Sequence, residues 1–106
     1  MDLNILIGQL ETISAGYAQK FDIDRTPDWF LLKLTEELGE LIQSYLKYAG
    51  QARVNGVSQA ELKRDLEEEL ADVLGMTLLV ANHHHIDLQE AISRKWLQDL
   101  ENDSSV

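Results

Sequence analysis

The sequence predicts an all-α fold, a bundle of four helices, and three observations support this prediction. In four separate segments apolar residues recur at spacings of three and four, which is the period of an amphipathic helix. No segment of the sequence alternates apolar and polar residues over the length of a half-buried strand. One proline and six glycines among 106 residues are fewer turn residues than an all-β fold of this length requires.

The first two helices are predicted in the N-terminal half of the chain. The first ends before residue 21, and its apolar stripe consists of Leu3, Leu6, Leu10, Ile13 and Tyr17. A short polar linker follows at 21–25. Thr26 can then cap a helix, and Pro27 suits the first helical position. This second helix is predicted to extend to about Ala49, because Gly50 suits the left-handed conformation that ends many helices.

A third helix is predicted to begin at Ser58, after a loop at 51–57. Ser58 and Glu61 have the spacing of a capping box. The helix is charged as far as Glu69 and almost wholly apolar over 70–81. A helix that is apolar on every side must be buried on every side, and three other helices in so short a chain cannot cover it. We therefore predict a homo-oligomer, a tetramer made of two dimers in preference to a dimer.

A fourth helix is predicted from Asp87, which can cap its first turn, to about Leu100, and the tail from about residue 101 is predicted to fray. The triplet His83-His84-His85 precedes it. Adjacent helical residues point about 100° apart, so we interpret the triplet as the end of the third helix and not as a zinc site. Trp96 fits the apolar stripe of the fourth helix and is predicted to lie in the core or at an interface.

Composition and charge exclude several classes of protein. The chain has 19 acidic and 9 basic residues and a net charge of -10, which opposes nonspecific binding to nucleic acid. Without cysteine it has no disulfide scaffold, no thiolate nucleophile and no cysteine-ligated zinc. It has no apolar run long enough to span a membrane and no signal-peptide pattern. We expect a soluble, cytoplasmic protein with one domain over residues 1–106.

Two acidic clusters fit a solvated helix surface poorly, although single acid pairs of this kind are usually solvated. Glu37 and Glu40, preceded by Glu36, lie about 60° apart on one helix face, and so do Glu69 and Asp72. The face that bears the second pair continues into apolar residues. Four partly buried carboxylates require protons or cations to neutralise them. Oxygen ligands without cysteine favour Mg²⁺, with Mn²⁺ as a substitute, and such a metal usually binds substrate phosphates as well.

The acidic clusters resemble a known signature. Residues 36–41 are Glu-Glu-Leu-Gly-Glu-Leu and residues 69–74 are Glu-Leu-Ala-Asp-Val-Leu. Together they are similar to the E-E-x-x-E … E-x-x-D motif of MazG-like nucleoside triphosphate pyrophosphohydrolases, in the all-α NTP pyrophosphatase superfamily. The resemblance extends over about residues 26–100. It implies Mg²⁺-dependent cleavage of a (d)NTP between its α- and β-phosphates to a monophosphate and pyrophosphate, in a house-cleaning role, by a MazG-like bundle.

The resemblance also implies roles by position. It implies that the metal ligands are Glu37, Glu40, Glu69 and Asp72. Glu36 would orient or deprotonate the attacking water, or it would support the metal ligands without contacting the metal itself, and these alternatives stay open. Lys95 matches a basic position that contacts phosphate. Asp99 departs from the family pattern of Asn followed by basic residues, which leaves open what holds the polyphosphate at the last helix.

Residues near the beginning of the second predicted helix are further candidates for substrate binding. Trp29 lies off the apolar stripe, so it either stacks on a base or packs against a neighbouring surface. Phe30 lies on the stripe and is predicted to belong to the core. Lys33 lies near the face of Glu37 and Glu40 and is either a surface charge or a phosphate contact.

Other functions remain open at this point. Within the superfamily, the alternatives are a phosphoribosyl-ATP pyrophosphohydrolase and a dUTPase-like enzyme. From another class, the chain could be a non-enzymatic acidic helical module that binds a partner and keeps its carboxylates solvated. The leading hypothesis expects a nucleoside triphosphate and further copies of the chain as partners, with no nucleic acid and no membrane.

Overall fold

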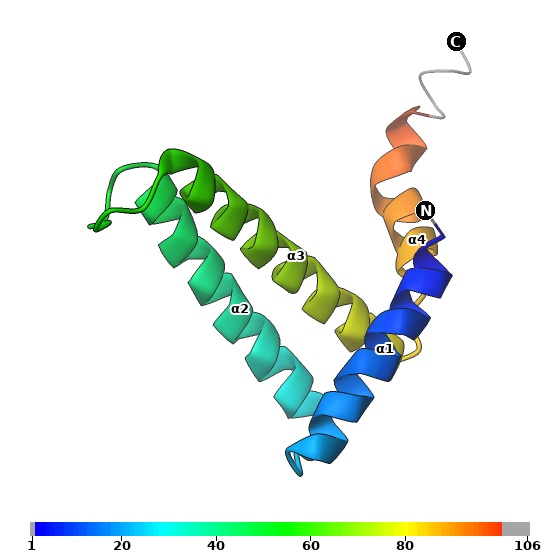
Figure 1. Ribbon diagram of the computed structural model, residues 1–106. Helices are drawn as coiled ribbons and strands as arrows, with labels where there is room; N and C mark the ends of the chain where they lie inside the picture. The colour runs from blue at the N-terminus through cyan, green and yellow to red at the C-terminus, as the bar shows by residue number, and fades with distance from the viewer. Residues whose placement is uncertain (1, 101–106) are drawn as a thin grey trace.

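The computed structural model describes residues 2–100, and these residues form helices and connecting loops without any strand (Figure 1). The all-α prediction is therefore confirmed. The elements in chain order are α1 (Leu3–Lys20), α2 (Pro27–Tyr48), α3 (Gln59–His83), α4 (Leu88–Ile92) and the π-helical segment η1 (Ser93–Leu97). The fraying that we predict from about residue 101 lies outside the described residues.

The ends of α2 and α3 confirm the capping predictions. The Thr26 hydroxyl accepts a hydrogen bond from the backbone N–H of Trp29 at 3.1 Å. The Ser58 hydroxyl accepts one from the backbone N–H of Glu61 at 3.2 Å. After α2 ends, Gly50 adopts a φ of 77°, the left-handed conformation in which glycine has no steric penalty. Local sequence signals thus set the length and position of the two longest helices.

The last helical segment starts as predicted but is less regular. Asp87 caps α4 by accepting a hydrogen bond from the backbone N–H of Glu90 at 3.1 Å. The π-helical turn of η1 then interrupts the α-helix before residues 98–100. Because a π turn is wider than an α turn, it rotates the following side chains away from a single stripe. Trp96 is 71% exposed, so the core interpretation is wrong, while an interface role stays a prediction.

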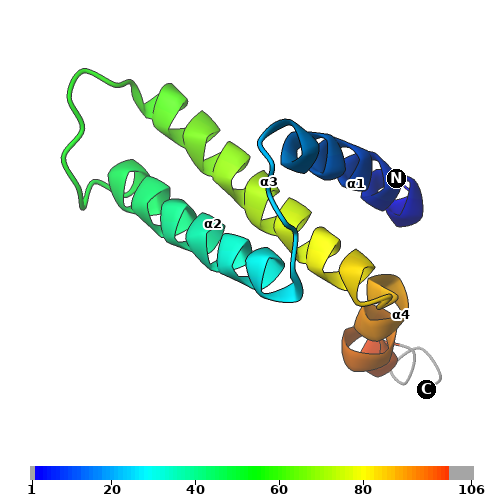
Figure 2. The ribbon, with the colours of Figure 1, turned by 90° about the horizontal axis from the view of Figure 1, so that it is seen from below.

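The helices form an open arrangement around one long pair. Helices α2 and α3 run antiparallel and lie side by side in both views (Figures 1 and 2). Helix α1 crosses the C-terminal half of α3, and the α4–η1 segment extends away from α2. The radius of gyration of 17.3 Å exceeds the value of about 13 Å expected of a compact chain of this length. Among the helices of residues 2–100, none combines the length and apolar character needed to cross a bilayer.

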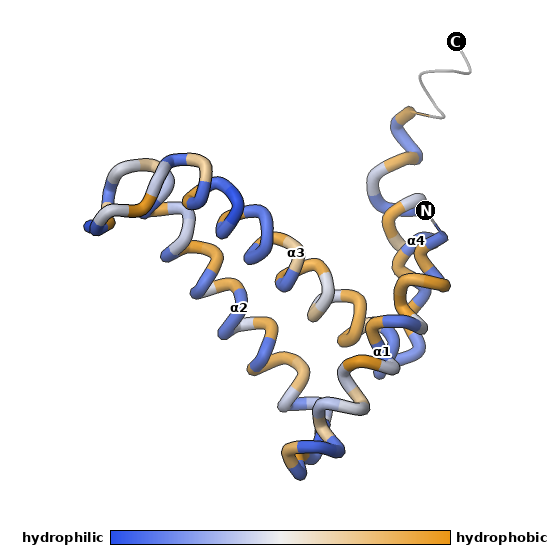
Figure 3. The backbone as a smooth tube through the Cα atoms, in the orientation of Figure 1, coloured by the Kyte–Doolittle hydropathy of each residue, from blue (hydrophilic) through white to orange (hydrophobic). Residues whose placement is uncertain are grey.

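The core is small and lies mainly where α1, α2 and α3 meet. Its buried apolar residues are Ala18, Phe30, Leu62, Leu78, Leu79 and Ala81, which confirms Phe30 as a core residue. Helix α3 changes from hydrophilic to hydrophobic along its length (Figure 3). In a single chain its apolar half is not covered on every side, as expected of so short a chain, since Leu70 and Leu74 are 52% and 54% exposed. The burial of this half by further copies of the chain stays a prediction. Among residues 2–100, α2 and α1 make the main contacts with α3, and they leave Leu70 and Leu74 uncovered.

Candidate metal centre

Three carboxylates converge between α2 and α3. Glu37 and Glu40 project from one face of α2, as their spacing of three residues predicts, and Glu69 faces them from α3. One carboxylate oxygen from each residue lies within 4.8 Å of the other two. The antiparallel packing of the two helices thus gathers acidic groups from distant parts of the sequence at one place.

Two oxygens of this cluster are buried without a hydrogen-bond donor. The Oε2 atoms of Glu37 and Glu69 have no partner among the described residues, and the same holds for the Oγ atom of Ser44. Buried polar atoms in folded proteins are almost always paired. A hard divalent cation prefers carboxylate and other oxygen ligands, so this donor set fits such an ion. The burial of these oxygens therefore supports a cation site.

The carboxylates perturb one another electrostatically. Burial is the largest cause that raises the pKa of Glu37 to about 7, followed by the negative charges of Glu40 and Asp72. Burial, followed by the same two charges, also raises the pKa of Glu69. Each shift shows that the negative form is disfavoured where the group lies. A bound cation would remove that penalty, and it would also be the partner that the unpaired carboxylate oxygens lack.

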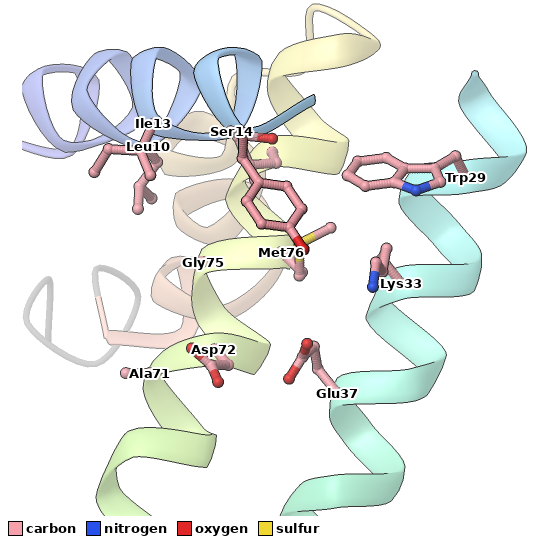
Figure 4. Close-up of a pocket in the computed structure, with 12 residues that line it drawn as sticks. Leu10, Ile13, Ser14, Trp29, Lys33, Glu37, Ala71, Asp72, Gly75 and Met76 are labelled. Atoms are coloured by element: carbon pink, nitrogen blue, oxygen red, sulfur yellow. The ribbon is translucent and has the colours of Figure 1, made fainter. Parts of the chain in front are cut away.

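The other predicted acidic residues lie near the cluster but not within it. Asp72, on α3, faces Glu37 across a cleft (Figure 4), although it is not one of the three groups whose oxygens converge. Glu36 is exposed on α2, and its Oε2 atom lies 3.3 Å from Nζ of Lys33. The structure therefore gathers Glu37, Glu40 and Glu69, leaves Asp72 beside them, and does not bring Glu36 into the cluster.

The cleft beside the carboxylates is a cavity of about 360 Å³ between α1, α2 and α3. Glu37 and Asp72 lie at one end and Trp29 at the other, with Lys33 between them along α2 (Figure 4). Trp29 also makes an edge-to-face contact with Phe30, at 5.1 Å between ring centroids. The cleft thus has an acidic end and an aromatic end, and the positively charged side chain of Lys33 lies between them.

Lys95 is predicted to contact the substrate, but the structure places it away from the carboxylates and the cleft. It lies in η1 and does not line the cleft. The α4–η1 segment extends from the end of α3 away from α2 (Figure 1). Within one chain, the structure does not bring Lys95 to the carboxylates.

Two contributions to the site were not foreseen from the sequence. Helix α1 supplies a wall of the cleft through Ser14, Tyr17 and neighbouring apolar residues. The apolar stripe of α1 indicates that this helix packs against another surface, but it does not indicate which surface. A second hollow of about 400 Å³ lies beyond the cluster, next to Glu40, Glu69 and Ser44. Ser44 follows Glu40 by four residues, so the two side chains share a helix face. This spacing is the signal in the sequence that places Ser44 next to the carboxylates.

One of three comparisons with known proteins gives a match. Neither the curated proteins nor the solved structures give a match to the chain. The family model of the MazG nucleotide pyrophosphohydrolase domain matches residues 25–96, which is more than half of the chain and includes α2 and α3 with every acidic residue of the site. Helix α1 lies outside the match. The chain therefore belongs to the MazG nucleotide pyrophosphohydrolase domain family.

Proposed function

We propose that this chain hydrolyses nucleoside triphosphates between the α- and β-phosphates and releases a nucleoside monophosphate and pyrophosphate. Its family points to nucleotide pyrophosphohydrolase activity in general. The observation that carries the finer proposal is the pair of buried, unpartnered oxygens of Glu37 and Glu69, because Glu37 also lies at one end of a cleft whose other end bears Trp29. A metal-bound polyphosphate and an attached base match these two ends.

The proposed cofactor is Mg²⁺, with Mn²⁺ as a substitute. Its proposed ligands are Glu37, Glu40, Glu69 and Asp72. When bound, such an ion offsets the charge of the triphosphate and polarises its phosphate oxygens. The carboxylates of the chain would hold the ion in place, and their mutual repulsion would be relieved by its charge.

The remaining site residues would act on the substrate directly. Trp29 offers an aromatic face for the base, and Lys33 lies along α2 between that face and the carboxylates, where its ammonium group can contact phosphate. Glu36, held 3.3 Å from Lys33, would orient the attacking water or take its proton, or act from behind the ligands. The water oxygen would bond to the α-phosphorus as the bond to the bridging oxygen breaks, and pyrophosphate would leave.

The proposed assembly is a homo-oligomer, a tetramer of two dimers in preference to a dimer. The exposed apolar residues that support it lie on the long helices: Leu31, Leu38, Ile42, Tyr45, Leu70 and Leu74. Exposed apolar side chains that gather on two packed helices are typical of a surface that binds a partner. Lys95, remote from the carboxylates of its own chain, would then contact phosphate at a neighbouring subunit's site. A species of 12.1 kDa at micromolar concentration in analytical ultracentrifugation would refute the assembly.

A product assay tests the proposed activity. The protein is incubated with Mg²⁺ and a panel of normal and damaged (d)NTPs, dUTP and phosphoribosyl-ATP, and pyrophosphate and orthophosphate are measured separately. We expect pyrophosphate and the monophosphate in equal amounts, and only when the divalent metal is present. A preference for damaged nucleotides would support the house-cleaning role. Orthophosphate alone would contradict the proposal, and no product from any substrate would favour the non-enzymatic interaction module.

A further inference from the structure

Helix α1 covers the cleft although it buries little apolar surface. Ala18 is the buried residue of this helix, while Ile13 and Tyr17 are exposed over more than half of their surface. Both of these exposed residues nevertheless line the cleft. Apolar burial stabilises packing in proportion to the area removed from water, so it holds α1 only weakly. Another interaction must therefore fix the position of this wall.

A polar cluster joins α1 to α3 and to the segment that precedes α2. The guanidinium of Arg25, in the segment between α1 and α2, forms an ion pair with Glu11 of α1. Nη1 of Arg25 donates to Oε2 of Glu11 at 3.2 Å and to Oγ of Ser14 at 3.2 Å. The same Glu11 oxygen accepts from Nδ2 of Asn82, on α3, at 3.5 Å. We call Glu11, Ser14, Arg25 and Asn82 the Glu11 cluster.

The environment of the Glu11 cluster makes it stronger than an ordinary surface pair. The side chains of Arg25 and Glu11 are only 20% and 32% exposed. The guanidinium carbon of Arg25 also lies 5.3 Å from the ring centre of Phe30, which is buried in the core. Partial burial reduces screening, and a guanidinium that contacts both oxygens of a carboxylate is held in a defined orientation.

The Glu11 cluster differs from the other ion pairs of residues 2–100 in what it joins. The others join residues three or four positions apart in α2, in α3 and, with Glu90 and Arg94, in the continuous α4–η1 segment. Exposed pairs of that kind stabilise little. Within the described part of the chain, the Arg25–Glu11 pair alone joins residues more than four positions apart.

The Glu11 cluster also lies at the aromatic end of the cleft. Ser14 belongs to both the cluster and the cleft lining, and it lies at the same end as Trp29, away from Glu37 (Figure 4). Arg25 lies four residues before Trp29 and contacts Phe30, so it joins α1 to the first turn of α2. We propose that Arg25 and Glu11 are positioning residues that hold α1 over the aromatic end and so set the affinity for the nucleoside part of the substrate. The inference rests on the proposed function because it takes the cleft to bind a nucleotide.

Steady-state kinetics of four altered proteins test the effect on substrate. They are Glu11→Gln, Arg25→Gln, Arg25→Lys and the charge-exchanged double variant Glu11→Arg with Arg25→Glu. At saturating Mg²⁺ we expect the two glutamine variants to raise KM about tenfold, equivalent to about 1.4 kcal/mol, and to leave kcat within about twofold of the original value, since the carboxylates are untouched. The KM of Arg25→Lys should lie between those of the original protein and Arg25→Gln. Lysine keeps the positive charge but has no planar guanidinium that contacts both carboxylate oxygens. The double variant should regain part of the affinity.

Arg94→Gln is the matched control, since it removes an exposed ion pair whose residues do not line the cleft, and it should leave KM unchanged. Hydrogen–deuterium exchange gives a second readout that needs no substrate. We expect faster exchange over α1 in Glu11→Gln and Arg25→Gln, with the exchange of the first half of α3 unchanged.

Each result decides a separate point. An unchanged KM in both glutamine variants, or a loss confined to kcat, refutes the effect on substrate affinity. Unchanged exchange over α1 refutes the role of the Glu11 cluster in holding that helix. Should the original protein hydrolyse no nucleotide, the proposed function and the effect on KM both fail, whereas the exchange measurement still decides whether the cluster holds α1.

Discussion

Glu37 and Glu69 lie on facing helices, and each has one carboxylate oxygen that is buried without a hydrogen-bond donor among the described residues. Neither helix needs these acids for its own formation, and each group lies where its negative form is disfavoured. The packing of α2 on α3 therefore opposes the ionisation of the groups that it brings together. We propose that a cation bound between the two helices completes this site.

Neutralising one proposed ligand should abolish activity without unfolding the protein. We expect Glu40→Gln and Asp72→Asn each to lower kcat/KM at least about 100-fold, because even the groups that support a metal ligand contribute about 10–100-fold. Helix content by circular dichroism should be unchanged, since neither side chain is buried. The control is Glu67→Gln, an exposed acid outside the site, which should change little. Equal losses in Glu67→Gln and Asp72→Asn would mean that the site is assigned to the wrong face of α3.

The stability of the metal-free protein should fall as the pH rises through neutrality. The pKa of Glu37 is raised by burial from 4.5 to about 7, so between these values the folded state holds a proton that the unfolded state has released. The free energy of unfolding therefore decreases with increasing pH in this range, and the shift of Glu69 acts in the same direction. Urea denaturation at about pH 5 and about pH 8, in the presence of a chelator, measures the effect.

Glu37→Gln provides the control for this pH dependence. The amide cannot ionise, so the fall in stability between the two pH values should be smaller in the variant, and at about pH 8 the variant should be the more stable protein. If the two proteins lose stability in parallel, the perturbed group lies elsewhere in the chain.

Local signals in the sequence predict the helices well. The caps at Thr26 and Ser58 and the glycine at residue 50 lie where the sequence expects them, because each depends on hydrogen bonds or backbone angles within a few residues. The pairing of Glu37 and Glu40 is predictable for the same reason. Helical periodicity alone fixes which side chains share a face.

What depends on packing between helices could not be predicted from one sequence. The stripe of α1 indicates an apolar face but does not indicate that Ser14 would line a cleft or that Glu11 would bind Arg25, since those contacts depend on the crossing of α1 over α3. What covers the exposed Leu74 could not be predicted for the same reason, because a pattern shows that a side chain prefers burial but not what buries it. The offset of Asp72 from the converging carboxylates depends on how far α2 and α3 are rotated about their axes.

Divalent metal should stabilise the protein through the same carboxylates that we propose as ligands. A ligand that binds only the folded state raises the free energy of unfolding by about 1.4 kcal/mol at about ten times its Kd. Thermal unfolding with increasing Mg²⁺, and separately Mn²⁺, should therefore shift Tm upward by several degrees. Glu40→Gln should lose most of this shift, whereas Glu67→Gln should keep it. A similar shift in both variants would place the bound ion outside the cluster.

Trp29 should contribute binding energy for the base and little to the chemical step. It lies at the end of the cleft opposite Glu37, and stacking of an aromatic side chain on a base contributes about 1–3 kcal/mol. We therefore expect Trp29→Ala to raise KM about tenfold or more with kcat nearly unchanged, and Trp29→Phe to keep part of the affinity. The chain has two tryptophans, so in a Trp96→Phe background the remaining fluorescence comes from Trp29. Titration with a nucleoside monophosphate should quench it, whereas inorganic phosphate should not. Quenching by phosphate alone, or an unchanged KM in Trp29→Ala, would show that the base binds elsewhere.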